Sequence, residues 1–185
     1  MEIHLVRHGR SALVHDGRWF RHAQVSAYED AYDAVGIRDD DNPGAEAARL
    51  AGGHALIVAS DLPRAIASAR RLAAEGDIHF SPLLREIRLE PPRWVPVRLP
   101  IQMWDVFSYV QWSYRLLSGA DHEFVRRARE AADWLAGHAA GSSSVVAVTH
   151  GGFRRLLDAR LVARGWKRGF TKRNYDNWSV WSYRA

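Results

Sequence analysis

Three short apolar runs, each bounded by polar residues or glycine, stand out along the chain: EIHLVR at 2–7, HALIVAS at 54–60 and SSVVAVTH at 143–150. They are rich in leucine and β-branched residues and have the length of strands rather than of helices. Continuous apolar runs of this kind are typical of strands that are covered on both faces. The pattern therefore predicts three buried strands.

Helical patterns follow the second and third runs directly. The stretch PRAIASARRLAAEG begins at Pro63, a residue suited to a first helical turn, and ends at a glycine, while GGFRRLLDARLVARG begins at Gly151. Apolar residues at helical spacing predict another helix that starts at the N-cap candidate Asp121, and residues 101–117 predict a further helix rich in aromatic side chains. Strands that alternate with helices favour an α/β fold with a parallel sheet.

Turn and loop signals separate these elements. Residues 90–100 (EPPRWVPVRLP) hold four of the seven prolines, which excludes a central strand or a helix interior there. Residues 39–44 predict a turn, and residues 177–184 (NWSVWSYR) alternate like a last strand with one wetter face. The sequence carries no linker long enough to divide it, so a single domain over 1–185 is expected.

Composition and charge narrow the classes of partner and chemistry. Of the 185 residues, 47% are hydrophobic and 25% charged, which are ordinary values for a globular domain. Lys and Arg (26) exceed Asp and Glu (21), and the pI near 10.0 favours anionic partners, whether nucleic acid, acidic lipid or phosphorylated small molecules. The absence of cysteine excludes disulfides, thiolate metal sites and cysteine nucleophiles. Neither a membrane span of roughly 20 apolar residues nor a signal-peptide pattern is present, so we expect a cytoplasmic protein with no membrane partner.

Cationic and imidazole side chains follow all three predicted strands. Arg7 and His8 end the first strand, Arg64 follows the second, and His150 ends the third, just before Gly151. Each alone has an ordinary explanation, because a histidine at a strand end is usually a satisfied polar residue and a first-turn arginine is usually solvated. The carboxyl ends of parallel strands meet at one edge of a sheet, however, and these groups would repel one another there without an anion. The N-termini of the two following helices would add free N–H groups, so we expect a phosphate site.

The runs LVRHGRS, ASDLPRAIASA and VTHGG, in this order, resemble the motifs of the histidine phosphatase superfamily, which has the phosphoglycerate mutase-like fold. The resemblance spans residues 3–152 and implies a three-layer α/β/α sandwich with a mostly parallel central sheet. It implies that His8 is the nucleophile that takes the phosphoryl group, that Arg7 and Arg64 grip the phosphoryl oxygens, and that His150 adds a further contact. Bidentate arginines neutralise such an anion, so neither a metal nor another cofactor is expected.

The resemblance also implies a glutamate that protonates the leaving oxygen. LLREIRLEPP offers Glu86 in the family's arrangement of leucine, any residue and glutamate, with Glu90 in reserve; the alternative is that REIRLE is only a solvated strand face. The expected phosphate-binding residues are Arg7, Gly9, Ser11, Arg64, His150 and Gly151, with Gly9 leaving room for the phosphate. The sequence departs from the family at Arg10 and Val14, and PPRW replaces the pattern that usually follows the acid.

These features indicate a phosphatase that acts on a small-molecule phosphate monoester, although the same site would also serve a mutase. The resemblance favours hydrolysis, because the mutases of the family carry longer insertions than fit between Glu86 and Asp121 and between His150 and the C-terminus. Specificity would come from lid segments near 10–40 and 90–115. The lid could grip a second anion, or it could simply cover a core. The side chains in question are Arg18, Trp19, Phe20, Arg21, His22, Arg93, Trp94, Arg98 and Trp104.

One alternative comes from another functional class. In RGWKRGFTKRNY (164–175) basic and aromatic residues interleave as they do in single-strand binders, which would suit an inactive module that binds nucleic acid or phosphate. A net charge of only +5 makes a nucleic-acid partner the weaker interpretation. The sequence names neither the substrate nor the oligomeric state.

Overall fold

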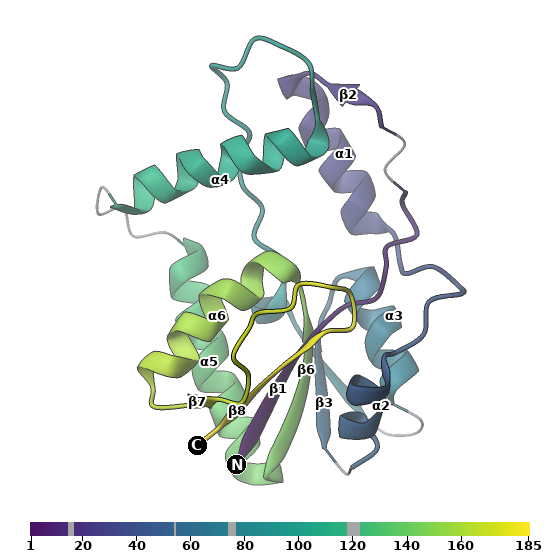
Figure 1. The fold of residues 1–185 in the computed structure, drawn as a ribbon, viewed down its shortest axis with the longest axis vertical. Helices are drawn as coiled ribbons and strands as arrows, with labels where there is room; N and C mark the ends of the chain where they lie inside the picture. Colours follow the sequence, from purple (N-terminus) through teal and green to yellow (C-terminus); the bar gives the residue numbers. More distant parts are fainter. Residues whose placement is uncertain (15–16, 54, 74–76, 118–122) are drawn as a thin grey trace.

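The computed structural model describes residues 1–14, 17–53, 55–73, 77–117 and 123–185 (Figure 1). Its main sheet has six strands in the order β4-β3-β6-β1-β8-β7. The strands are β1 (Glu2–Arg7), β3 (Leu56–Ser60), β4 (Ile78–Ser81), β6 (Ser144–Thr149), β7 (Lys167–Arg168) and β8 (Val180–Arg184). The first four of these pair in parallel, whereas β8 runs antiparallel to β1 and β7 antiparallel to β8.

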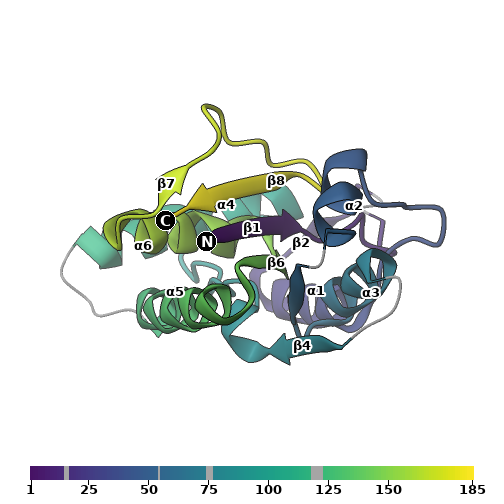
Figure 2. The ribbon, with the colours of Figure 1, turned by 90° about the horizontal axis from the view of Figure 1, so that it is seen from below.

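Helices cover both faces of this sheet (Figure 2). One face carries α5 (Glu123–Ser142) and α6 (Gly151–Ala163), and the other carries α2 (Ala45–Ala51) and α3 (Pro63–Leu72). Side chains alternate along the strands, so Val145 packs under α5 and α6 while Val146 packs under α2 and α3. The predicted three-layer α/β/α fold with a mostly parallel sheet is confirmed.

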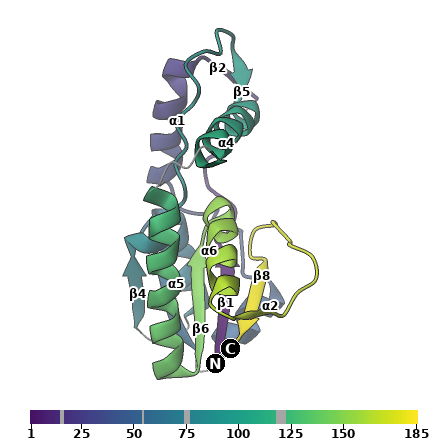
Figure 3. The same ribbon diagram turned by 90° about the vertical axis from the view of Figure 1, so that its left-hand side faces the viewer.

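The remaining elements lie beyond the carboxyl edge of the sheet (Figures 1 and 3). They are β2 (Trp19–Phe20), α1 (His22–Ala34), the short 3-10 turn η1 (Pro82–Leu84), β5 (Leu99–Pro100) and α4 (Ile101–Leu117). α1, α4 and the β2–β5 ribbon, called here the α1–α4 unit, share a small core of Phe20, Val25, Val95, Ile101 and Trp104. Trp104 is fully buried, and its Nε1 donates to the Phe20 carbonyl at 2.9 Å.

Most of the predicted elements are present with small shifts at their ends. The predicted helix over 101–117 forms as α4, and the predicted N-cap at Asp121 lies outside the described residues. The proline-rich segment is irregular except for β5, which pairs at the edge of a two-stranded ribbon. Among the described helices, none has the length and apolar content needed to cross a membrane.

The prediction of a strand over 177–184 is wrong for its first three residues. β8 begins only at Val180, because Trp178 adopts a left-handed backbone conformation with φ of 64° and the Ser179 N–H closes a turn on the Asp176 carbonyl. The buried Trp178 indole donates to Asp41 at 2.7 Å. This contact joins the segment before β8 to the loop that precedes α2.

Candidate active site

The two predicted histidines lie next to each other at the carboxyl edge of the sheet. β1 and β6 pair in parallel with Arg7 opposite Thr149, so His8 and His150 leave the sheet at the same level. Their ring centroids are 5.0 Å apart, and the side chains are 2% and 0% exposed. The structure therefore brings together residues that are separated by most of the chain.

The surroundings of His8 fix its tautomer. Its Nδ1 lies 2.6 Å from the Gly9 carbonyl oxygen, which can only accept a hydrogen bond, so Nδ1 carries the proton and Nε2 keeps its lone pair. Burial, with the neighbouring Arg64 guanidinium and to a lesser extent Arg7, lowers the pKa of His8 to about 3. The Asn177 amide donates to the carbonyls of His8 and Gly9 and holds this loop. His8 is thus a neutral, oriented imidazole at neutral pH.

His150 is completely enclosed and occupies the N-cap position of α6. Its Nε2 is 2.9 Å from the Ser60 hydroxyl at the end of β3, whereas its Nδ1 is buried without a hydrogen-bond partner among the described residues. Burial, followed by the charges of His8 and Arg64, lowers its pKa well below the ordinary value. A second neutral imidazole, that of His150, therefore lies next to that of His8.

Arg7 and Arg64 reach the same region from different elements. Arg7 donates through Nη1 to the Tyr175 carbonyl, and Arg64 donates through Nη1 to Tyr32 O at 3.1 Å and Asp33 Oδ1 at 2.9 Å. The Arg64 guanidinium lies over the Tyr32 ring, 4.5 Å from its centroid. Within the described part of the chain, the Nε of each arginine is buried without a partner. Both arginines line the same cavity and retain donors for an anion.

Glu86 lies at the start of α6. Its Oε1 accepts from Ile87 N at 2.9 Å and Phe153 N at 2.7 Å, and its Oε2 accepts from Gly152 N at 3.0 Å. A Cβ on Gly152 would come within 2.8 Å of Oε1, so glycine there makes room for the carboxylate. The carboxyl group faces the cavity that Arg7 and Arg64 line.

This arrangement corrects the prediction that the helix N-termini offer free N–H groups to a phosphate. At α6 the N–H groups of Gly152 and Phe153 are occupied by Glu86. At α3 the first residue is Pro63, which has no N–H, and the N–H groups of Ala65 and Ile66 bond to Leu62 O. The N–H groups of Gly152, Phe153, Ala65 and Ile66 are therefore not free for a phosphate.

The other predicted residues have different surroundings. Glu90 is exposed and lines an adjoining cavity rather than the one that contains Arg7 and Arg64. The Ser11 hydroxyl accepts from Leu13 N at 3.2 Å and does not line either described cavity. A Cβ on Gly151 would contact the Arg7 guanidinium at about 3.5 Å, so the glycine lets that side chain pass.

The requirement for glycine at position 9 has a packing origin. A Cβ there would come within 2.5 Å of Asp41 Oδ2 and 2.8 Å of the Trp178 ring, so the glycine faces these two side chains. Asp41 is buried and accepts from Arg10 N and Arg10 Nε, each at 2.6 Å. Sequence reasoning missed Asp41, which fixes the loop after His8 although it lies far away along the chain.

A cavity of about 560 Å³ lies between the edge of the sheet and the α1–α4 unit. Tyr28, Tyr32 and Asp33 from α1 and Tyr109 from α4 line it. Of the aromatic and basic residues that the sequence singled out near 18–22 and 93–104, none lines this cavity or its neighbour in the described structure. The α1 residues could not be detected from an apolar pattern, because only Val25 of that helix is buried.

The aromatic side chains of the segment at 164–175 pack in or against the core, whereas its basic residues are exposed. The ring of Phe170 stacks on Trp181 at 5.5 Å, and Trp166 is 6% exposed. Arg168 and Arg173 both pair with the buried Asp158, at 2.7 and 2.6 Å. These aromatic rings are not available as a stacking platform for bases.

Comparisons with known proteins extend this description. The family model described as "Histidine phosphatase superfamily (branch 1)" matches residues 3–184. Among solved structures, a phosphoserine phosphatase variant from Entamoeba histolytica in complex with phosphoserine is 14% identical with a TM-score of 0.55, covering 98% of this chain and 89% of the other.

A putative alpha-ribazole-5'-P phosphatase from Escherichia coli is 22% identical with a TM-score of 0.53, covering 88% of this chain and 79% of the other. A mycobacterial glucosyl-3-phosphoglycerate phosphatase is 18% identical, with the same TM-score and the same two coverages. Identities this low establish a shared fold. Comparison with curated protein sequences found no match.

Proposed function

Because this chain belongs to the histidine phosphatase superfamily, we propose that it is a metal-independent phosphatase that hydrolyses a small-molecule phosphate monoester through a phosphohistidine on His8. The observation that carries the proposal is the state of His8. Its Nδ1–H is bound to the Gly9 carbonyl, its Nε2 lone pair is free of a proton, and Arg7 and Arg64 are close enough to lower its pKa. A neutral nucleophile beside two guanidinium groups suits attack on a phosphoryl group.

The reaction would proceed in two displacements. In the first, His8 Nε2 forms a bond to phosphorus while the bond from phosphorus to the ester oxygen breaks, and the departing oxygen takes a proton from the Glu86 carboxylic acid. In the second, a water oxygen bonds to phosphorus and the phosphorus–nitrogen bond breaks, while the water gives a proton back to Glu86. Arg7 and Arg64 would balance the charge on the phosphoryl oxygens in both steps.

Glu86 would need a proton and a change of partner to fill this role. In the ligand-free structure it only accepts hydrogen bonds, from three backbone N–H groups. The carboxyl group nevertheless lines the same cavity as both arginines, whereas Glu90 does not. That difference supports Glu86 as the acid.

Hydrolysis is favoured over phosphoryl return to a second hydroxyl because the cavity is in contact with solvent. Val106 and Val110 of α4 line it and are 53% and 58% exposed. A mutase must keep water away from its phosphorylated intermediate, and these open walls would admit water.

The decisive experiment compares His8→Ala with the wild type in EDTA near pH 6 on a panel of phosphate monoesters. We expect phosphate release to fall by several orders of magnitude, because the neighbouring His150 is fully enclosed, with its Nε2 bonded to Ser60, and would not replace His8 as the nucleophile. His79→Ala, an exposed histidine on β4, serves as the matched control and should keep its activity. Equal activity of His8→Ala and the wild type would refute the proposal, and tight phosphate binding without turnover would favour an inactive binding module.

A further inference from the structure

The cavity beside Arg7 and Arg64 has two chemically different sides. Its base at the edge of the sheet carries those arginines together with Glu86. The opposite wall carries apolar side chains from α1, α4 and the segment after η1, among them Leu89, Ile101, Val106, Tyr109 and Val110. Charged side chains of the same elements also line the cavity, namely Glu29, Asp33, Arg88 and Asp105.

Three apolar residues of α4 on this wall are exposed. Tyr109 and Val110 follow Val106 at helical spacings of three and four, so they share a face of α4 with it, and Val106, Tyr109 and Val110 are 53%, 42% and 58% exposed. The same helix also carries the buried residues Ile101, Trp104 and Trp112, of which Ile101 lines this cavity and Trp112 the adjoining one. Contiguous exposed apolar side chains that line a cavity and are rimmed by charge mark a binding surface.

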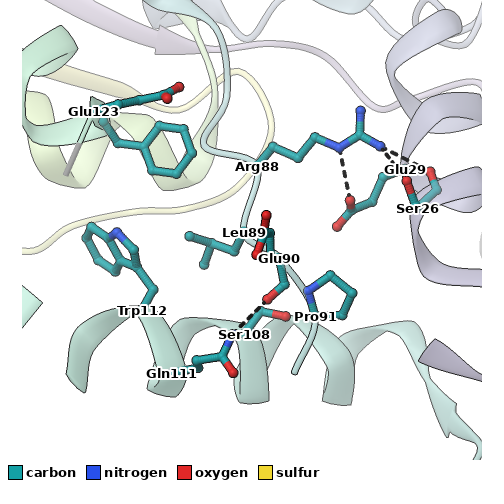
Figure 4. Close-up of a pocket in the computed structure, with 11 residues that line it drawn as sticks. Ser26, Glu29, Arg88, Leu89, Glu90, Pro91, Ser108, Gln111, Trp112 and Glu123 are labelled. Atoms are coloured by element: carbon teal, nitrogen blue, oxygen red, sulfur yellow. Dashed lines mark hydrogen bonds and ion pairs between the residues drawn. The ribbon is translucent and has the colours of Figure 1, made fainter. Parts of the chain in front are cut away.

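A second cavity continues the first away from the arginines (Figure 4). It measures about 520 Å³ and shares Glu29, Arg88, Leu89 and Ser108 with the first cavity. Leu89 and the Trp112 indole border it on one side, and the Arg88 side chain reaches toward Glu29 on the other. The connected space is therefore much longer than a phosphate group.

The charges around this space disfavour a second anion at its far end. The outer cavity has the carboxylates of Glu90 and Glu123, the carboxyl group of Glu29, whose pKa is raised by burial, and one guanidinium, that of Arg88. Arg88 is already paired with Glu29 at 3.2 Å and with Asp30 at 2.8 Å. In the inner cavity, Arg155 donates to the Tyr175 hydroxyl at 3.0 Å and lies 5.7 Å from the centroid of the Tyr109 ring, which places it beside the apolar wall.

We infer that the substrate is a phosphate monoester of an alcohol with a sizeable uncharged apolar group, alkyl or aromatic, which lies against Val106, Tyr109 and Val110. The inference rests on the proposed function and specifies its substrate class. The phosphoryl group binds at Arg7 and Arg64, and the apolar group covers the exposed face of α4. Burial of that face by the substrate supplies binding free energy that phosphate alone cannot.

The test compares propyl phosphate with hexyl phosphate, whose ester bonds are chemically equivalent. Each fully buried methylene group is worth about fourfold, so the three added groups should raise kcat/KM about tenfold when burial is partial. In the double variant Val106→Asn/Val110→Asn the ratio of hexyl to propyl should fall to about two. Met103→Asn is the matched control, because Met103 is 42% exposed on α4 but does not line either described cavity, and it should keep the wild-type ratio.

The outcomes separate this inference from the proposed function. A wild-type ratio near one with both esters hydrolysed, a ratio retained in the double variant, or a preference for phosphoserine over hexyl phosphate would each overturn the substrate class and leave the phosphatase intact. If the wild type turns over no ester, the proposed function fails. Calorimetry with propylphosphonate and hexylphosphonate then decides the inference, since tighter binding of the hexyl compound supports the apolar wall and equal binding refutes it.

Discussion

The carboxyl edge of the sheet and the α1–α4 unit face each other across one cavity, but they are held in different ways. At the edge, His8, Arg64 and His150 are each no more than 2% exposed, and the sheet that carries them has an apolar cluster on each face. In α1, Val25 is the one buried residue of the helix. Polar contacts join the unit to the rest of the chain, such as those of Arg64 with Asp33 and of Arg88 with Glu29.

This difference suggests that the edge of the sheet determines the chemical step and that the α1–α4 unit determines substrate selectivity. Buried groups in a close-packed setting keep their positions, which phosphoryl transfer requires of its nucleophile and its arginines. Polar contacts near solvent contribute little individually and can exchange, so the wall that meets the organic part of a substrate can adjust. We therefore propose that the α1–α4 unit, formed by the segments near 10–40 and 90–115, acts as a lid. Substitutions at the edge should change the chemical step, and those in the unit should change substrate choice.

The largest effect expected in this comparison is that of Glu86→Gln at the edge. Glutamine keeps the shape of the side chain but cannot donate the proton that the leaving oxygen needs. The rate with alkyl phosphates should fall by about 10²- to 10⁴-fold. With p-nitrophenyl phosphate the loss should be much smaller, because that leaving group departs without protonation. Steady-state kinetics on both ester types measures the contrast.

Glu130→Gln, an exposed glutamate on α5, is the control and should change neither rate. Glu90→Gln tests the reserve candidate. An undiminished rate of Glu86→Gln on alkyl esters, or a greater loss in Glu90→Gln, would remove Glu86 from the mechanism.

The edge was the more predictable of the two regions because its elements depend on local sequence. Each of β1, β3 and β6 is a run of apolar residues followed by a polar end, and the parallel arrangement brings those ends together. By contrast, α1 and α2 carried no predicted helix. In α1 (HAQVSAYEDAYDA) the residues alternate between small, polar and aromatic types, and its single buried position leaves no periodic apolar face to detect.

The missed parts of the site come from contacts that spacing cannot reveal. Asp41 contacts the His8 loop through Arg10 and Trp178, both distant from it in the sequence. Glu86 was predicted as an acid from its motif, but its place against the N–H groups of α6 follows from tertiary packing. The helix terminus that seemed suited to phosphate already binds a carboxylate.

Lowering the pH should have opposite effects on the folding stability contributed by the edge of the sheet and by the α1–α4 unit. The pKa of His8 is lowered from 6.5 to about 3, so the unfolded chain binds more protons between these values and stability is lost as pH falls through that window. Burial, with smaller contributions from Asp105 and Asp33, raises the pKa of Glu29 to about 7 despite Arg88. Its contribution has the opposite sign and is lost as pH rises from 4.5 to 7.

Urea unfolding between pH 7.5 and 4.5 measures the balance, with a slope of up to about 1.4 kcal/mol per pH unit for each group. We expect His8→Ala to lose less stability than the wild type on acidification, and Glu29→Gln to lose more. If all three proteins showed the same pH dependence of stability, His8 and Glu29 would not make the opposite contributions proposed here.

The smallest expected effect lies at the contact that joins the two regions. Asp33 on α1 accepts from Arg64 at 2.9 Å while a bound phosphate would need the same guanidinium. Asp33→Asn keeps the size of the side chain and removes the competing charge. Phosphate should therefore bind about two- to fivefold more tightly, the range of a partly exposed ion pair, with kcat little changed. The inhibition constant for inorganic phosphate measures this, and the gain should shrink in high salt.

Asp30→Asn is the matched control, because it removes the same charge from the same helix but breaks a pair with Arg88. If phosphate binding tightened equally in both variants, the change in net charge alone would explain the effect. Weaker phosphate binding in Asp33→Asn would mean that Asp33 orients Arg64 instead of competing for it. In that case α1 would belong to the phosphate site. The fixed part of the cavity would then include α1 together with the edge of the sheet, and only α4 would remain as the adjustable wall.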